Sequence, residues 1–223
     1  MSTGSSPAPA EQRLALEGFY TERRIVELEL DPVRGGFDAA HVREINRRIF
    51  QDLPGAGCAD VTPGRHRLPV PAGRDWMKQR SLATVNGVFH VAYSRTDAVA
   101  QAGMDAALEA AHPDRLRGLD AATFTARIAQ LYASVDYAHP FSDGNSRTLR
   151  TYTRQLARTA GGVLDWERFS HRPADRDALY IARDISVNRI AQPQIQQEQT
   201  MRRVAASLAA LKGYKDLPAL LVS

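Results

Sequence analysis

A segment of twelve residues near the middle of the chain concentrates side chains that could do chemistry. It reads His139-Pro140-Phe141-Ser142-Asp143-Gly144-Asn145-Ser146-Arg147-Thr148-Leu149-Arg150. A proline cannot continue a helix, so one helix should end before Pro140 and a loop of about five residues should lead into the next. The first turn of that next helix presents unpaired backbone N–H groups and the positive end of the helix dipole. The segment therefore predicts an anion-binding site.

Two arginines at the start of the predicted helix strengthen this hypothesis. Arg147 and Arg150 are three residues apart and so share one face of its first turns. Cations there oppose the helix dipole at a cost of about 0.3–1 kcal/mol each, which a bound anion would offset. Guanidinium groups match phosphate oxygens, and Gly144 allows the backbone to approach a ligand closely.

A carboxylate and a histidine complete the set. Asp143 could bind Mg²⁺, which usually bridges phosphates through one or two carboxylates. His139 carries an imidazole, whose ordinary pKa of about 6.5 suits a general base at neutral pH. A base, a metal ligand, an anion site and two arginines so close together predict phosphoryl or nucleotidyl transfer.

This segment resembles the Fic family signature, H-x-F-x-[D/E]-G-N-[G/K]-R-x-x-R, at every specified position except Ser146. Residues 36–42 (GFDAAHV) and 49–53 (IFQDL) are similar to the family's G-x-F-D-x-x-H-L … F-Q-D-L helix. With the helix expected after Gly162, the resemblance covers roughly residues 17–190. It implies an all-α fold, a helical bundle of the Fic type with one small β-hairpin, the flap.

The resemblance also implies an activity, that of a protein adenylyltransferase. Such an enzyme moves AMP from ATP to a Tyr, Thr or Ser hydroxyl of a target protein and releases pyrophosphate. Carried over by position, His139 would deprotonate that hydroxyl, and Asp143 would hold Mg²⁺ between the α- and β-phosphates. Asn145 and the backbone around Gly144 would hold the α-phosphate, where charge grows in the transition state.

The remaining motif positions receive roles in the same way. Arg147 would contact the β-phosphate and Arg150 the γ-phosphate, while Phe141 would anchor the loop in the core. Ser146 stands where the family usually has Gly or Lys, and its small hydroxyl can donate to a phosphate. Doc-type relatives, which transfer phosphate, have Ala-Asn-Lys at 144–146, which weighs against kinase activity here. Two alternatives stay open: transfer of UMP, phosphate or phosphocholine on the same scaffold, and a catalytically degenerate binding module.

Control of the site is a further implication of the resemblance. Many family members are inhibited by a glutamate in an [S/T]-x-x-x-E-[G/N] helix, and Glu17-Gly18 matches the end of that motif. We expect Glu17 to block Arg150 and so to misplace the γ-phosphate. The alternative is an ordinary exposed glutamate, with a separately encoded inhibitor, an antitoxin protein, as the source of control.

A hairpin is predicted over residues 82–93. Asn86-Gly87 lies between β-branched and aromatic residues and suits the positive φ angles of a type I′ turn. This hairpin falls where the family has its flap. The resemblance implies that an exposed strand edge there takes up the target as an added strand, through Thr84, Val85, Asn86, Gly87, Val88 and Phe89.

The other segments are typical of helices. Apolar residues recur with helical period in 42–53 and 124–135, where Asp38 and Asp120 are candidate N-caps. Residues 54–80 are rich in Gly and Pro and show no period. Further helices are expected at about 11–30, 97–111, 145–161, 174–190 and 194–212. The organisation predicted is a disordered leader (1–10), a Fic domain (11–190) and a C-terminal helical extension packed on it (191–223).

Composition narrows the class. The chain has 223 residues, a net charge of +4 and 43% hydrophobic residues, which fits one globular domain. It has no run of about 18 apolar residues that would span a membrane. The single Cys58 excludes an internal disulfide and a multi-thiolate zinc site. We expect no nucleic-acid partner, and either a bacterial cytoplasmic location or delivery into a host cell as an effector.

Overall fold

The computed structural model describes residues 10–222, so the predicted leader lies outside the described residues except for Ala10. The described chain is mainly helical and contains one two-stranded antiparallel sheet, which confirms the predicted fold class. Its elements are α1 (Ala10–Leu30), α2 (Ala39–Phe50), β1 (Trp76–Ser81), β2 (Val88–Tyr93), α3 (Ala98–Ala110), α4 (Pro113–Leu116), α5 (Ala121–Ala138), α6 (Asn145–Thr159), α7 (Pro173–Ala191), α8 (Glu198–Ala210) and α9 (Leu217–Val222).

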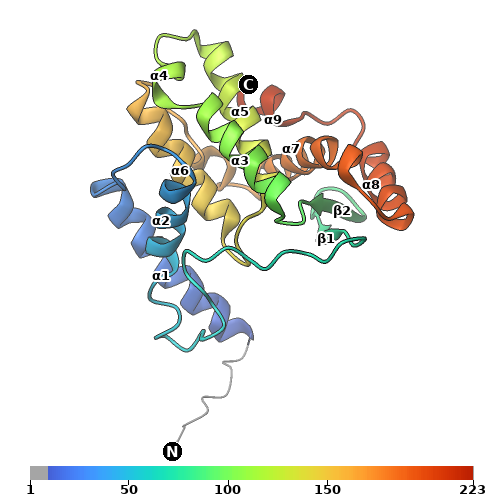
Figure 1. Cartoon of the computed structure of the whole chain (residues 1–223), viewed down its shortest axis with the longest axis horizontal. Coiled ribbons are helices and arrows are strands. Elements are labelled where there is room, and N and C mark those ends of the chain that lie inside the picture. The colour runs from blue at the N-terminus through green and yellow to red at the C-terminus, as the bar shows by residue number, and fades with distance from the viewer. Residues whose placement is uncertain (1–9, 223) are drawn as a thin grey trace, which may run out of the picture.

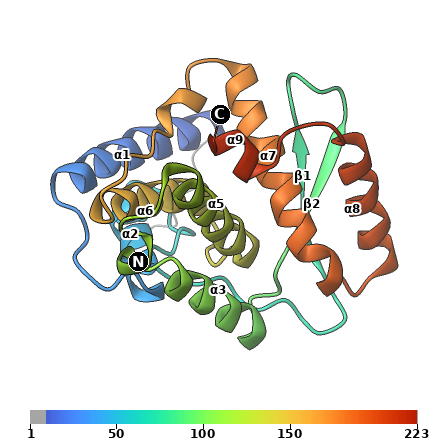
Figure 2. The same cartoon turned by 90° about the horizontal axis from the view of Figure 1, so that it is seen from above.

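Helix α5 lies at the centre of the bundle (Figure 2). It packs against α3, α6, α7 and α9. Its apolar residues Ile128, Leu131, Tyr132 and Val135 are buried as the helical period predicts, and Asp120 caps its N-terminus. Helices α1, α2 and α6 gather on one side of α5, and α7, α8 and the hairpin lie on the other (Figures 1 and 2). The loop between α5 and α6 therefore leads from the centre of the bundle to the side that holds α1 and α2.

Helix α2 follows the sequence prediction closely. The Asp38 carboxylate accepts a hydrogen bond from the N–H of His41 (2.9 Å) and so caps the helix. The stripe predicted for its inner face is fully buried: Val42, Ile45, Ile49, Phe50 and Leu53. This face packs on α6 and brings Phe50 to the loop that precedes α6.

The hairpin exists, but its predicted limits are wrong. Trp76 pairs with Tyr93 and Ser81 with Val88, so residues 82–87 form the connecting loop. Of these loop residues only Gly87 has a positive φ angle, so no type I′ turn forms.

Contacts with α7 explain this difference. The carboxylate of Asp177 accepts hydrogen bonds from the Thr84 backbone N–H (2.8 Å) and hydroxyl (3.0 Å). Leu82 is buried against Ile181 and Ile185. These tertiary contacts hold the loop open and move the first strand into the segment that shows no period.

The C-terminal part packs on the rest of the chain. Helix α8 contacts β2, and α9, which the sequence pattern did not predict, contacts α5 and α7. The division at residue 190 stays a prediction. No helix within residues 10–222 is both long and apolar enough to cross a bilayer.

Candidate active site

The junction of α5 and α6 is held in one conformation by short-range contacts. His139 ends α5 in the left-handed region (φ 44°, ψ 58°) and donates its backbone N–H to the carbonyl of Val135 (3.0 Å). The Asn145 side chain closes the loop, since its amide donates to the Phe141 carbonyl (2.7 Å) and its oxygen accepts from the Phe141 N–H (3.0 Å). Phe141 is buried in the core, as expected for an anchor. The side chain of Asn145 thus holds the loop, and its backbone N–H lies at the start of α6.

Gly144 is required by both its backbone and its surroundings. It caps α6 with φ 74°, a region that other residues rarely adopt. A Cβ atom there would lie 1.9 Å from the Phe50 ring. No other residue fits this position without moving α2 or the loop.

The N-terminus of α6 keeps its N–H groups free. The first helical bond is donated by Thr148 to Gly144, and within residues 10–222 the N–H groups of residues 145–147 make no hydrogen bond. Three N–H donors and the helix dipole thus point toward the loop. Asp143 beside them is exposed, and its carboxylate makes no ion pair in the described part of the chain.

The imidazole of His139 is buried, with 6% of its surface exposed. It lies against the rings of Tyr93 (4.0 Å between centroids) and Trp76 (5.0 Å) from the hairpin. Its Nε2 atom is 3.2 Å from Nζ of Lys78. Burial lowers the pKa of His139 to about 4, because the nearby Asp136 carboxylate only partly offsets burial and Lys78 lowers the pKa further. The ring is therefore neutral at pH 7.

A buried ion pair lies behind His139. The Arg183 guanidinium on α7 holds both carboxylate oxygens of Asp136 at 2.9–3.0 Å. Arg183 also donates to the Ser146 hydroxyl in the first turn of α6 (3.2 Å). Burial would raise the pKa of Asp136, but Arg183 and His139 outweigh burial and hold that pKa at about 2.

The backbone carbonyl of His139 is also held by a cation. Arg67 donates its Nε–H to this carbonyl (2.8 Å), and its guanidinium lies 3.8 Å from the centre of the Trp76 ring. Burial lowers the pKa of Arg67 to about 10. Arg67 thereby ties the α5–α6 junction to the first strand of the hairpin.

These neighbours of His139 carry little signal in the sequence. Asp136 precedes His139 by three residues on one helix, a spacing that does predict contact. Lys78 falls in the segment without a period, while Arg67 and Arg183 reach the junction only through the tertiary fold.

The two motif arginines have different environments. Arg147 forms an ion pair with Glu17 of α1 (2.5 Å). Arg150 makes no ion pair in the described part of the chain, and its charge acts on Tyr132 of α5. Although the two arginines are only about 60° apart around α6, Arg147 is the one that reaches Glu17. The expected contact of Glu17 with Arg150 is therefore wrong, and Glu17 pairs with Arg147 instead.

The two edges of the hairpin differ in how their outward backbone groups are hydrogen-bonded. The N–H of Ala92 donates to the Asn188 side chain (3.0 Å), and the N–H of His90 donates to the Ser207 hydroxyl (2.9 Å). These bonds cap the outer edge of β2. Met77 and Gln79 lie opposite Ala92 and His90, so their backbone groups point away from β2 and make no hydrogen bond within residues 10–222. Strand β1 thus has an open edge at Met77 and Gln79, Thr84–Gly87 lie in the connecting loop, and docking through Thr84–Phe89 stays a prediction.

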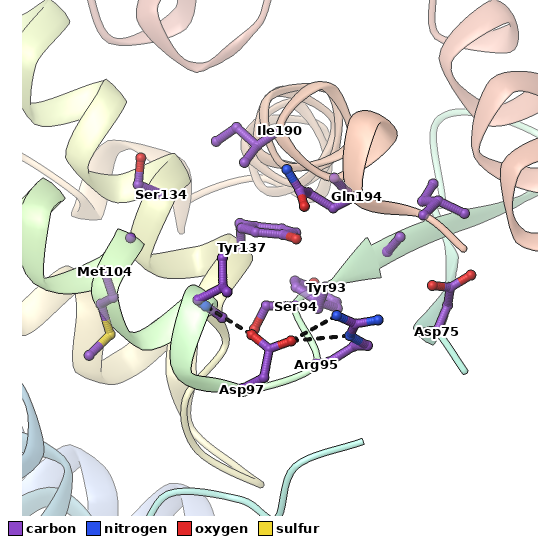
Figure 3. Close-up of a pocket in the computed structure, with 16 residues that line it drawn as sticks. Asp75, Tyr93, Ser94, Arg95, Asp97, Met104, Ser134, Tyr137, Ile190 and Gln194 are labelled. Atoms are coloured by element: carbon purple, nitrogen blue, oxygen red, sulfur yellow. Dashed lines mark hydrogen bonds and ion pairs between the residues drawn. The ribbon is translucent and has the colours of Figure 1, made fainter. Parts of the chain in front are cut away.

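A cavity of about 380 Å³ lies where the end of β2 meets α3, α5 and α7 (Figure 3). Tyr93 and Tyr137 form part of its wall, and the Arg95–Asp97 ion pair lies at one side. Tyr93 is shared with the site, because its ring also contacts His139. None of the motif residues 139–150 lines this cavity.

The sequence is similar to a known protein family and to several named proteins. The model of the Fic/DOC family matches residues 36–157. The protein adenylyltransferase VbhT of Bartonella schoenbuchensis is 27% identical over 167 residues, which are 74% of this chain and 30% of VbhT. The probable protein adenylyltransferase Fic of Escherichia coli is 27% identical over 162 residues, 70% of this chain and 68% of that protein. The chain thus matches less than a third of the length of VbhT.

Solved structures agree at the level of the fold. BepC, a VirB-translocated effector protein of Bartonella tribocorum with bound AMPPNP, superposes with a TM-score of 0.56. The sequence identity is 15%, and the match covers 92% of each chain. The family model covers more than half of the sequence and includes the α5–α6 junction. This chain is a member of the Fic/DOC family.

Proposed function

We propose that this chain is a protein adenylyltransferase that moves AMP from ATP to a Tyr, Thr or Ser hydroxyl of a target protein and releases pyrophosphate. One observation carries the proposal: a buried, neutral imidazole lies at the loop that leads into a helix N-terminus with free N–H groups and two arginines. Two relatives are named adenylyltransferases, and BepC binds the ATP analogue AMPPNP. These findings support transfer of a nucleotide.

The triphosphate of ATP would bind at the N-terminus of α6. The N–H groups of residues 145–147 would hold the α-phosphate. The Ser146 hydroxyl, which accepts from Arg183, would still have its own proton to donate to a phosphate oxygen. Arg147 would take the β-phosphate and Arg150 the γ-phosphate. A hollow of about 420 Å³ between the hairpin and α7, lined by Leu82 and Tyr180 among others, has room for the adenine ring of ATP.

Asp143 fits a magnesium ion. Its carboxylate is exposed and unpaired in the described chain, and Mg²⁺ is commonly held by a single carboxylate together with waters and phosphates. No cluster of three or more His, Cys, Asp or Glu side chains occurs in residues 10–222, so no site built from protein ligands alone competes with it. When bound, the ion would neutralise charge on the phosphates and on the departing pyrophosphate.

His139 would act as the general base through Nε2. The hydroxyl oxygen of the target bonds to the α-phosphorus, the bond from that phosphorus to pyrophosphate breaks, and the hydroxyl proton moves to Nε2. The neutral state of His139 at pH 7 leaves it able to accept this proton. Lys78, now 3.2 Å from Nε2, would have to give way to the hydroxyl.

The target would dock by adding a strand to β1. The free backbone groups of Met77 and Gln79 offer this edge, while Asn188 and Ser207 cover the edge of β2. Lys78 lies between the two docking positions on the same strand. An extended target segment on β1 would therefore run past the residue that contacts His139.

Glu17 is the residue that we expect to restrain this site. Its ion pair withdraws Arg147 from the β-phosphate. The β-phosphate is next to the α-phosphorus that reacts, whereas Arg150 would contact the more distant γ-phosphate. A separate antitoxin protein would be the source of control if Glu17 has no effect.

The direct test is incubation of the purified chain with Mg²⁺ and ATP labelled at the α or the γ position, in bacterial and in host-cell lysates. We expect protein-bound α-label that disappears with His139→Ala. Glu17→Gly is assayed in parallel, because the wild type would show little transfer if Glu17 inhibits it. Label from the γ position would identify a phosphotransferase, and UTP or a phosphocholine donor would be tried next. The absence of any transfer in both lysates would favour a binding module.

A further inference from the structure

The two ring nitrogens of His139 face groups of opposite charge. Nε2 lies 3.2 Å from Nζ of Lys78, an ammonium that can only donate, so Nε2 has to present its lone pair. The proton of the neutral ring therefore belongs on Nδ1. The polar atom beside Nδ1 is Oδ1 of Asp136, 3.7 Å away. Nδ1 is buried and has no hydrogen-bond partner in the described chain, so a small ring rotation toward Asp136 is the way to satisfy it.

Asp136 is held in place more firmly than an ordinary helix residue. It is 1% exposed and Arg183 is 3% exposed, and the two make a bidentate ion pair. They come from different helices, α5 and α7, so the pair fixes the carboxylate against the whole bundle. A carboxylate placed in this way can orient an imidazole one turn later on its own helix.

The same arginine reaches the phosphate-binding end of the site. Arg183 donates to the hydroxyl of Ser146, the one motif position at which this chain departs from the family signature. A glycine at position 146 would offer no acceptor side chain. The contacts His139–Asp136–Arg183–Ser146 thus form one chain from the base to the first turn of α6.

We propose that Asp136, clamped by Arg183, is the positioning residue that keeps the proton of His139 on Nδ1 and so leaves Nε2 free to act as the base. The claim that Nε2 is the base rests on the proposed function, whereas the position of the proton does not. Asparagine at 136 could donate to Nδ1 and would favour the opposite tautomer, which cannot accept a proton at Nε2. The equivalent change in the catalytic triad of serine proteases acts in this way.

Other charged and titratable groups face the ring from each neighbouring element. They are Lys78 of β1, Tyr93 of β2, Arg183 of α7 and, on the backbone carbonyl, Arg67. Within residues 10–222 Asp136 is the carboxylate that approaches the ring. Three of the other four groups are cations without an acceptor atom, and the Tyr93 hydroxyl makes no hydrogen bond with Nδ1 in the described chain, which leaves Asp136 as the acceptor for Nδ1–H.

The test is a nitrogen NMR spectrum of the ¹⁵N-histidine-labelled chain without nucleotide, with His139 assigned by its loss in His139→Gln. We expect a protonated Nδ1 and an unprotonated Nε2 in the wild type, and the reverse or a mixture in Asp136→Asn. In the transfer assay Asp136→Asn should lower kcat about a hundredfold and leave the KM for ATP within about twofold. A wild-type proton on Nε2, or an unchanged tautomer in Asp136→Asn, would overturn the proposal.

A matched control separates positioning from loss of a buried charge. Asp184→Asn removes a second buried carboxylate, the partner of Arg80 (2.7 Å), and should leave the tautomer of His139 unchanged. If Asp136→Asn alone fails to fold because Arg183 is left unpaired, the double variant Asp136→Asn/Arg183→Gln removes that charge and gives the same readout. If the proton of His139 moves from Nδ1 to Nε2 in Asp136→Asn but the wild type transfers no AMP, the proposed function is refuted and this inference is supported.

Discussion

Glu17 and Arg147 are 130 residues apart in the chain, yet their side chains form an ion pair of 2.5 Å between α1 and the first turn of α6. The Glu17 carboxylate thus pairs with Arg147, a cation that we expect to bind a phosphate. Both side chains are about one quarter exposed, so the pair can break without unfolding the bundle.

Removal of Glu17 should raise the proposed rate of AMP transfer. A partly exposed ion pair of about 1 kcal/mol predicts that Glu17→Gly raises the rate of AMP transfer about fivefold at subsaturating ATP. The matched control is Glu22→Gly, which lowers helix propensity equally in α1 but removes no ion pair of the described chain. Equal rates for the two variants would show that Glu17 does not restrain the site.

Substitution of Gly144 should destabilise the fold through the contact with Phe50. Gly118 has almost the same φ angle (75° against 74°), but no atom lies within 4 Å of its would-be Cβ. We expect Gly118→Ala to cost about 1–2 kcal/mol from the backbone alone. Gly144→Ala should cost about 2 kcal/mol more because of the overlap. Urea unfolding of both variants measures the difference, and equal losses would contradict the contact.

Docking on β1 can be tested with a single proline. Gln79→Pro removes an outward N–H from the open edge and leaves the bonds between β1 and β2 intact, since proline is tolerated on edge strands. We expect kcat/KM for the protein target to fall about tenfold, with the KM for ATP and the melting temperature nearly unchanged. Gln79→Ala, which removes the side chain but retains the N–H, should behave as wild type. A similar loss in both variants would assign the effect to the side chain.

The buried imidazole should make the protein less stable in acid. The pKa of His139 is about 4 in the folded state and about 6.5 when unfolded, so below pH 6.5 the unfolded chain binds a proton that the folded chain rejects. Stability therefore falls as the pH drops from 6.5 to about 4, by up to about 3 kcal/mol from this group. His139→Gln removes that dependence.

The measurement is the free energy of unfolding in urea between pH 7.5 and about 4.5 for both proteins. Other histidines with lowered pKa values, such as His41 and His66, contribute equally to both and cancel in the difference. Asp136 loses its contribution only below its unfolded pKa of about 3.9, outside this range. Parallel curves for wild type and variant would mean that His139 is accessible to protons in the folded state.

Local signals in the sequence predicted the helices well. Asp38 and Asp120 accept hydrogen bonds at the starts of α2 and α5, because capping depends on residues three positions away. The buried stripe of α2 follows from helical period in the same way. The α5–α6 junction was likewise predictable, since a proline and a glycine fix it locally.

Features that depend on distant residues could not be predicted. The hairpin loop is held by Asp177, 93 residues from Thr84, and this overrides the turn preference of Asn86-Gly87. The clamp on Asp136 comes from Arg183, 47 residues later. The choice of Glu17 between two arginines depends on the angle at which α1 passes α6, which no residue pattern specifies.

The two edges of the hairpin differ in a way that limits how many strands it can recruit. A sheet that is open on both sides can grow in either direction, and identical sheets can then stack into fibres. Here Asn188 and Ser207 cover the outward N–H groups of Ala92 and His90 with side chains rather than with another strand. If a target docks on β1 as proposed, the hairpin would take up one extended segment, and the stoichiometry would be one target segment per molecule.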